Sequence, residues 1–305
     1  MSSIELTMPS TTPVTSPQEE ISEEGVSLWN DAFRRLLKNK LAVFGLWFLL
    51  AEALICFASP WIAPYGFEDQ TLENTLAPPS LEHWMGTDTL GRDLCSRLLF
   101  GGRVSLTVGI LASLVSMMVG VIYGAVSGFV GGKTDSVMMR IVDVLYALPF
   151  VFLVIILMVY FGRNFILLFV ALGLTQWLTM ARIVRGQVLS LRHKEFVEAA
   201  YSMGIPPLTI IFRHLIPNCF GPVIVYLTLT VPSVILDEAF LSFLGLGVQA
   251  PMASWGTLIS SGVEVMEIAP AQLLFPALSL SLTLFSLNFL GDGLRDALDP
   301  KGAKD

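Results

Sequence analysis

Apolar stretches separated by polar segments run along this 305-residue chain. The stretches cover roughly residues 41–58, 104–130, 141–161, 165–181, 220–244 and 271–290. Each is near the roughly 20 residues that a helix needs to cross a bilayer. Because backbone groups in lipid must pair within the spanning element, helices are the expected form. The pattern predicts an all-α integral membrane protein with about six transmembrane helices.

The polar segments complete the expected organisation. It consists of a disordered acidic tail at 1–27, a basic interfacial helix at 28–40, a first transmembrane helix at 41–58, an external loop at 59–103, a core at 104–291 with five further transmembrane helices, and a tail at 292–305. The core contains a long polar loop at 182–218. The tail at residues 1–27 is rich in Ser, Thr, Pro and Glu and has no Lys or Arg, a composition that is typical of disordered segments.

Basic residues indicate the orientation. If the N-terminus is cytoplasmic, the inner segments hold four basic residues before the first stretch, two after the second, five in the loop 182–218 and three at the C-terminal end, which is 14 of the 18 Lys and Arg. Cytoplasmic loops carry the excess of Lys and Arg in membrane proteins. Both termini and the loop 182–218 are therefore expected in the cytoplasm.

Composition narrows the class further. The chain is 54% hydrophobic and 14% charged, whereas a soluble domain carries about 25% charged residues. The net charge of −7 argues against nucleic acid as a partner. The three cysteines are widely spaced and the three histidines are scattered, so neither a disulfide framework nor a metal site is expected. These residues are Cys56, Cys95, Cys219, His83, His193 and His214.

One segment resembles the end of a phosphate-binding loop. The run Gly131-Gly132-Lys133-Thr134 has Ser127 where the motif needs its first Gly, and an apolar stretch precedes it instead of a strand. The segment is therefore interpreted as a plain turn. No nucleotide or other cofactor site is expected in this chain.

The second apolar stretch carries small residues at every fourth position. They are Ala112, Ser116, Gly120, Gly124 and Gly128. Such a face lets another helix approach closely in lipid. It indicates either ordinary bundle packing or a helix that slides during transport. Pro149 and Pro232 are expected to kink the stretches that contain them.

Three acids lie within or near the apolar stretches. Asp143, Asp237 and Glu238 are interpreted either as contacts in a transport pathway or as members of internal ion pairs, since ionisable groups at membrane depth face a cavity or pair internally. The sequence does not distinguish these interpretations.

The loop 182–218 has a predicted shape. Residues 195–203 should be helical, and Gly204 is placed to end that helix in a left-handed conformation. Pro206 or Pro207 suits the first turn of a second helix, and Pro217 is expected to mark its end. The result is a helix–turn–helix knob, although a solvated amphipathic loop is an alternative from spacing alone.

At this loop the sequence resembles the membrane subunits of bacterial ABC importers. That family carries Glu-Ala-Ala, three residues, Gly, nine residues and Ile-x-Leu-Pro. The matching residues here are Glu198, Ala199, Ala200, Gly204 and Pro217, while His214 and Ile216 replace the Ile and Leu. The resemblance implies that a separate ATPase docks on these residues and on Arg213.

Other segments resemble the peptide and nickel importer subfamily, and within it the C-type permease of oligopeptide importers. They include residues 86–93, 96–97, 102–106, 240–247, 255–256 and 291–300. The resemblance implies a non-catalytic permease in a bacterial inner membrane. Its expected partners are a second homologous permease, two ABC ATPases that use ATP and Mg, an external substrate-binding protein and the peptide.

Alternatives remain at this point. The same subfamily includes permeases for dipeptides or nickel. A stand-alone secondary transporter would need its own coupling-ion site, often in repeated halves, and the sequence shows no clear internal repeat. An intramembrane enzyme would need paired catalytic groups, and no such pair is evident.

Overall fold

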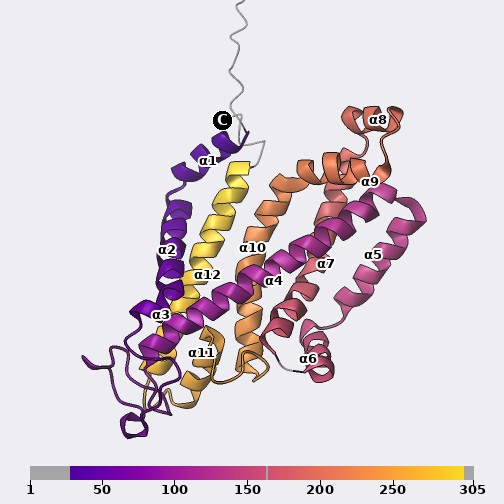
Figure 1. Ribbon diagram of the computed structural model, residues 1–305. Coiled ribbons are helices and arrows are strands. Elements are labelled where there is room, and N and C mark those ends of the chain that lie inside the picture. The colour runs from indigo at the N-terminus through magenta and orange to yellow at the C-terminus, as the bar shows by residue number, and fades with distance from the viewer. Residues whose placement is uncertain (1–27, 163, 299–305) are drawn as a thin grey trace, which may run out of the picture.

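The computed structural model describes residues 28–298 except residue 163, and the described chain forms a bundle of long helices (Figure 1). Five helices are long and apolar enough to cross a membrane. They are α2 (Lys40–Phe57), α4 (Leu94–Val130), α7 (Phe165–Leu191), α10 (Ile216–Phe243) and α12 (Ala271–Leu298). Together with a bent helix pair, they confirm the expected all-α membrane fold with five to six spans.

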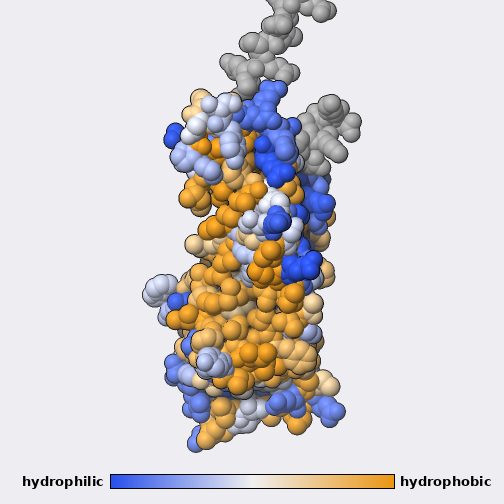
Figure 2. Space-filling model, turned by 90° about the vertical axis from the view of Figure 1, so that its right-hand side faces the viewer, coloured by the Kyte–Doolittle hydropathy of each residue, from blue (hydrophilic) through white to orange (hydrophobic). Residues whose placement is uncertain are grey.

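The surface fits this interpretation. Figure 2 shows a broad band of hydrophobic side chains over the middle of one face, with hydrophilic side chains gathered at its two ends. Exposed apolar side chains include Trp47 on α2, Ile156 on the short helix at Phe150–Phe161, and Leu278 on α12. A band of this kind matches a hydrocarbon layer between two polar interfaces.

The third apolar stretch is not one straight helix. Instead, α5 (Gly132–Ala147) and α6 (Phe150–Phe161) meet at an angle of 89°. Leu148 between them has an extended backbone, and Pro149 precedes the first residue of α6. Proline disfavours helical geometry in the residue before it, so the expected kink is a full break.

Two helices extend beyond the boundaries expected from apolarity. The helix α7 continues to Leu191, ten residues into the expected loop 182–218, and α4 begins at Leu94, so the outer loop ends before residue 103. The Asp93 side chain accepts a 2.7 Å bond from the Ser96 amide and caps α4. Both extensions contain polar and charged residues, so apolarity alone did not mark these helix ends.

Pro217 does not end a helix. The short helix α9 (Pro207–Ile210) passes through a π-helical turn, η2 (Ile211–Leu215), directly into α10, and Pro217 lies in the first turn of α10. The Ile216 amide donates to Ile211 O, five residues back. This wider turn changes the hydrogen-bond register just before the proline, which lets the helix continue.

The N-terminal helices pack along α12. The helix α1 (Leu28–Lys38) covers the expected basic segment, and the Asn39 side chain caps α2 by accepting from two amides. Ala32 and Leu36 of α1 contact the last turns of α12, which reaches Leu298 instead of ending near residue 290. The expected tail 1–27 and residues 299–305 lie outside the described residues.

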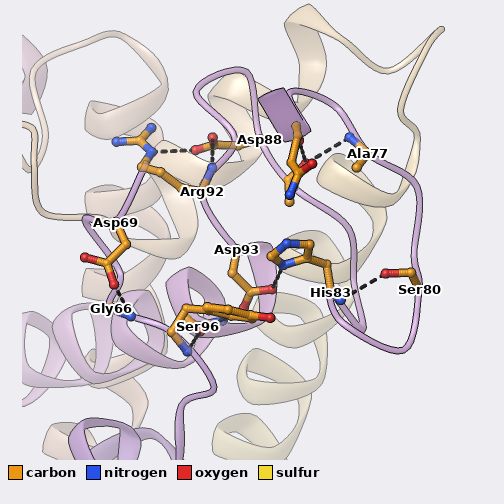
Figure 3. A network of polar contacts seen from close by, with 12 residues as sticks. Gly66, Asp69, Ala77, Ser80, His83, Asp88, Arg92, Asp93 and Ser96 are labelled. Carbon is orange, nitrogen blue, oxygen red and sulfur yellow. Dashed lines mark hydrogen bonds and ion pairs between the residues drawn. The ribbon is translucent and has the colours of Figure 1, made fainter. Parts of the chain in front are cut away.

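A polar network stabilises the end of the bundle where the segment before α4 lies (Figure 3). The segment before α4 contains α3 (Ser59–Ile62) and η1 (Leu72–Asn74), and α11 (Trp255–Glu264) precedes α12. Asp88 pairs with Arg92 at 2.7 Å, and His83 Nδ1 lies 2.9 Å from Asp93. Gln272 of α12 donates to Thr87 O at 2.6 Å. These contacts give the segment at residues 86–93 a defined shape.

Candidate functional site: a projecting coupling surface and a polar cavity

The helix α8 (Glu195–Ser202) projects from one end of the bundle (Figure 1). Gly204 follows it with φ +73°, a left-handed conformation that glycine adopts without strain. The Gly204 amide donates to Tyr201 O at 2.9 Å, and the Ile205 amide donates to Ala200 O at 3.1 Å. This pair of bonds is a Schellman motif. The turn then enters α9 with Pro207 in its first turn.

The two faces of α8 differ. Val197 and Ala200 are buried in an apolar cluster. The cluster also contains Ile210 of α9, Leu215 of the π-helical turn, and residues of α4, α7 and α10. Glu198 and Ala199 are exposed on the other face. Large apolar side chains are exposed beside them, namely Phe196, Tyr201, Met203 and Leu208. An exposed patch of this composition is typical of a protein interface.

An ion pair and several hydrogen bonds join the helices from which α8 projects. Arg185 of α7 makes two bonds to Asp135 of α5, at 2.5 and 2.6 Å, and Ser127 of α4 donates to the same carboxylate at 2.6 Å. Arg192 donates to Gly128 O at 3.2 Å. A bidentate arginine–carboxylate pair is among the stronger polar contacts in proteins. Three helices are therefore tied together where α8 leaves the bundle.

A ring contact links α8 itself to α4. Tyr201 stacks on Phe129 with centroids 5.9 Å apart. Neither this contact nor the Asp135–Arg185 pair was identified from the sequence, because the partners are far apart along the chain. The sequence signal for the pair was Asp135, an acid in a short segment that also holds Lys133 and Arg140.

The remaining predicted loop residues occupy different places. Arg213 is exposed in the π-helical turn, and Pro217 is exposed at the start of α10. They lie after α8 and α9 rather than on the α8 face itself. Glu198, Ala199 and Gly204 are the predicted residues that α8 and its turn present to solvent.

The stripe of small residues on α4 lies against α7. A Cβ added at Gly124 would lie 2.3 Å from Ala181 O, and one added at Gly128 would lie 2.9 Å from Arg185 O. Ala112, Ser116 and Gly120 are also buried. The stripe is therefore a packing surface between two helices of this chain, and close backbone approach is its physical basis.

The three predicted acids have different surroundings. Glu238 is fully buried and accepts from Ser105 at 3.2 Å and Ser242 at 2.7 Å. Asp143 is exposed and pairs with Arg182 at 2.8 Å. Asp237 is partly buried and accepts from Gln176 Nε2 at 2.9 Å.

Asp237 is the acid of the three that lines a cavity. This cavity has a volume of about 360 Å³ and lies between the α5–α6 bend, α7 and α10. Its polar lining residues are Tyr146, Thr175, Gln176, Thr179 and Asp237. We refer to it as the polar cavity.

Comparisons with known proteins agree with this architecture. Residues 120–304 match the family described as the binding-protein-dependent transport system inner membrane component. Residues 27–79 match the N-terminal TM domain of oligopeptide transport permease C.

Curated relatives cover nearly the whole chain. The oligopeptide transport system permease protein OppC of Haemophilus influenzae is 53% identical over 93% of this chain and 92% of its own length. The protein of the same name from Bacillus subtilis is 46% identical over 93% of this chain and 93% of its own length. The dipeptide transport system permease protein DppC of Bacillus subtilis is 48% identical over 93% of this chain and 89% of its own length.

A solved structure shares the fold. A chain of the MetNI methionine ABC transporter, in inward-facing conformations, superposes with a TM-score of 0.53 at 18% identity, over 66% of this chain and 96% of that chain. The expectation of an importer permease is confirmed: this chain belongs to the family of binding-protein-dependent transport system inner membrane components.

Proposed function

We propose that this chain is the permease subunit of an ATP-driven oligopeptide importer, and that α8 with its Gly204 turn docks on a separate ATPase subunit. The observation that carries the proposal is the built shape of α8. One face is buried in the bundle, the opposite face presents Glu198 and Ala199, and exposed apolar side chains surround them. An ATPase that grips such a rigid knob can transmit its motion to α7, α9 and α10.

The oligopeptide substrate is inferred from the curated relatives named above, since they match over nearly their whole lengths. The dipeptide permease of Bacillus subtilis supports a second candidate, import of dipeptides. Uptake competition between dipeptides and longer peptides would distinguish the two.

The complete importer then contains further subunits. A second, homologous permease forms the other half of the pathway, and two ATPases bind and hydrolyse ATP with Mg. A substrate-binding protein delivers peptide from outside. This chain has no catalytic role, and both of its termini lie in the cytoplasm of a bacterial cell with the chain in the inner membrane. The excess of Lys and Arg in the loop 182–218 supports this orientation.

A matched pair of charge reversals tests the docking. Glu198→Arg places a cation on the exposed face of α8, while Glu264→Arg makes the same change at the end of α11, at the opposite end of the bundle (Figure 1). We expect Glu198→Arg to abolish ATPase copurification and ATP-dependent peptide uptake, with normal membrane levels of the chain. Glu264→Arg should retain the ATPase.

The docking proposal is wrong if both variants copurify the ATPase to the wild-type extent. Loss of the ATPase from both variants would also contradict it, because a general loss of fold would then be the cause.

A further inference from the structure

We propose that the Asp237 carboxylate, oriented by Gln176, contacts ammonium and amide N–H groups of the peptide as it crosses the membrane. The inference rests on the proposed function and adds a substrate-contacting residue to it. The observations concern the polar cavity between α5, α6, α7 and α10.

The Asp237 carboxylate can accept more hydrogen bonds than the one that it receives from Gln176. Its Oδ2 accepts the 2.9 Å bond from Gln176, and Asp237 takes part in none of the ion pairs found among the described residues. An ionised carboxylate has about four acceptor sites. The side chain is only partly buried and lines the cavity, so it has acceptor sites left for a ligand there.

The other acids of the spanning helices are occupied differently. Glu238 is sealed from solvent and bonded to two serines, and Asp143 is neutralised by Arg182. Glu52 of α2 lies 2.8 Å from the Thr283 hydroxyl of α12, on the far side of the bundle from the polar cavity. Asp237 therefore differs from them in lining the cavity without a cationic partner in the described chain.

The cavity belongs to a longer polar strip. Thr175, Thr179 and Arg182 recur on one face of α7 at helical spacing. Arg182 lies 4.4 Å from the centre of the ring of Tyr146, which also lines the cavity. Together with Gln176 and Asp237, these partly exposed side chains give the part of α7 and α10 that lines the cavity a polar surface.

The dimensions suit part of a peptide. Ligand pockets range from about 300 to 1,000 Å³, and this cavity of about 360 Å³ accommodates one or two residues at a time. The Asp237 carboxylate attracts an N-terminal ammonium or a lysine side chain. The Gln176 amide and the threonine hydroxyls provide neutral donors and acceptors for the peptide backbone.

Cysteine labelling tests the electrostatic part of the proposal without a transport assay. The native cysteines, Cys56, Cys95 and Cys219, are buried, so a cysteine introduced at Thr179 is the accessible thiol. We expect Thr179→Cys, in the assembled complex, to react with a cationic and an anionic methanethiosulfonate reagent. Adding Asp237→Asn should reduce the ratio of cationic to anionic rates by about tenfold. Adding Glu52→Gln, which neutralises an acid of α2 on the far side of the bundle, should leave the ratio within about twofold.

Three labelling outcomes would overturn the proposal. The first is no reaction at Thr179→Cys, and the second is a ratio that Asp237→Asn does not change. The third is an equal change with Glu52→Gln. Leu278→Cys, on the exposed apolar face of α12, is the control position and should not react with either charged reagent.

Transport by the reconstituted complex tests the substrate contact. With the binding protein saturating, Asp237→Asn should slow uptake of trilysine by at least about fivefold relative to trialanine. Glu52→Gln, on the far side of the bundle, should affect the two peptides equally. If the wild-type complex takes up neither peptide, the proposed function is wrong. If the wild type takes up both and Asp237→Asn treats them alike, the Asp237 proposal is wrong while the proposed function stands.

Discussion

At the residue scale, the backbones of α4 and α7 approach closely along the stripe of small residues. The small residues of α4 recur at every fourth position, and the sequence therefore predicted that a helix could approach this face. The partner helix could not be predicted from the pattern, since any helix with a smooth surface fits such a stripe. The structure shows that α7 occupies it, with Ala181 O and Arg185 N next to Gly124.

We predict that Gly124→Ala destabilises the purified chain by about 1–3 kcal/mol, because the added methyl group would force the α4 and α7 backbones apart. Gly221→Ala is the matched control, since Gly221 is also helical and a Cβ there would meet no neighbour within 4 Å. The control should be neutral or slightly stabilising. Thermal unfolding in detergent measures both, and equal melting temperatures for the two variants would contradict the prediction.

At the element scale, the positions where helices end or break differ most from those expected from the sequence. Proline was expected to end the helix before residue 217, but a π-helical turn precedes Pro217 and the helix continues as α10. Proline was expected only to kink the third stretch, but the chain turns by 89° there. In both places the outcome depends on hydrogen-bond register and on neighbouring helices, which local propensity does not contain.

The end of α8 leads to a prediction for Gly204. Its φ of +73° costs a β-branched residue about 1–2 kcal/mol. Gly204→Val should therefore distort the turn and weaken ATPase stimulation by peptide, while Gly204→Asn should retain most of it, because asparagine tolerates this conformation. Purified complexes in nanodiscs provide the measurement.

Gly245 offers a matched control for this series. It has φ +74° and open space around it, and it follows α10 at the opposite end of the molecule. Gly245→Val carries the same backbone strain but should leave stimulation of the ATPase by peptide intact. Equal losses at the two glycines would show that strain alone, rather than the α8 turn, causes the effect.

At the scale of the whole molecule, two different polar structures lie at opposite ends of an apolar bundle (Figure 1). One is the projecting helix α8, supported by the Asp135–Arg185 pair. The other is the network around Asp88 and Asp93 (Figure 3). The proposed orientation places the first in the cytoplasm and the second outside.

Cysteine substitutions at the two ends test this orientation. Leu81 is 97% exposed in the outer segment, and Met203 is 71% exposed after α8. We predict that a membrane-impermeant maleimide labels Leu81→Cys in cells whose inner membrane is intact, and labels Met203→Cys only after that membrane is permeabilised. The buried native cysteines provide a low background. The reverse labelling pattern would contradict the proposed orientation and would place α8 outside the cell.

The sequence by itself determined the class of fold, because runs of apolar residues of bilayer length leave few alternatives to spanning helices. It also determined the outline of α8 and its turn, since Gly204 and Pro207 act through their own backbone geometry. Only the tertiary structure decided which helix fills the stripe on α4 and how far α4, α7 and α12 extend. It alone separated Asp237, which lines a cavity, from the sealed Glu238 beside it. The physical reason is that burial, ion pairing and cavity shape depend on residues far apart in the chain.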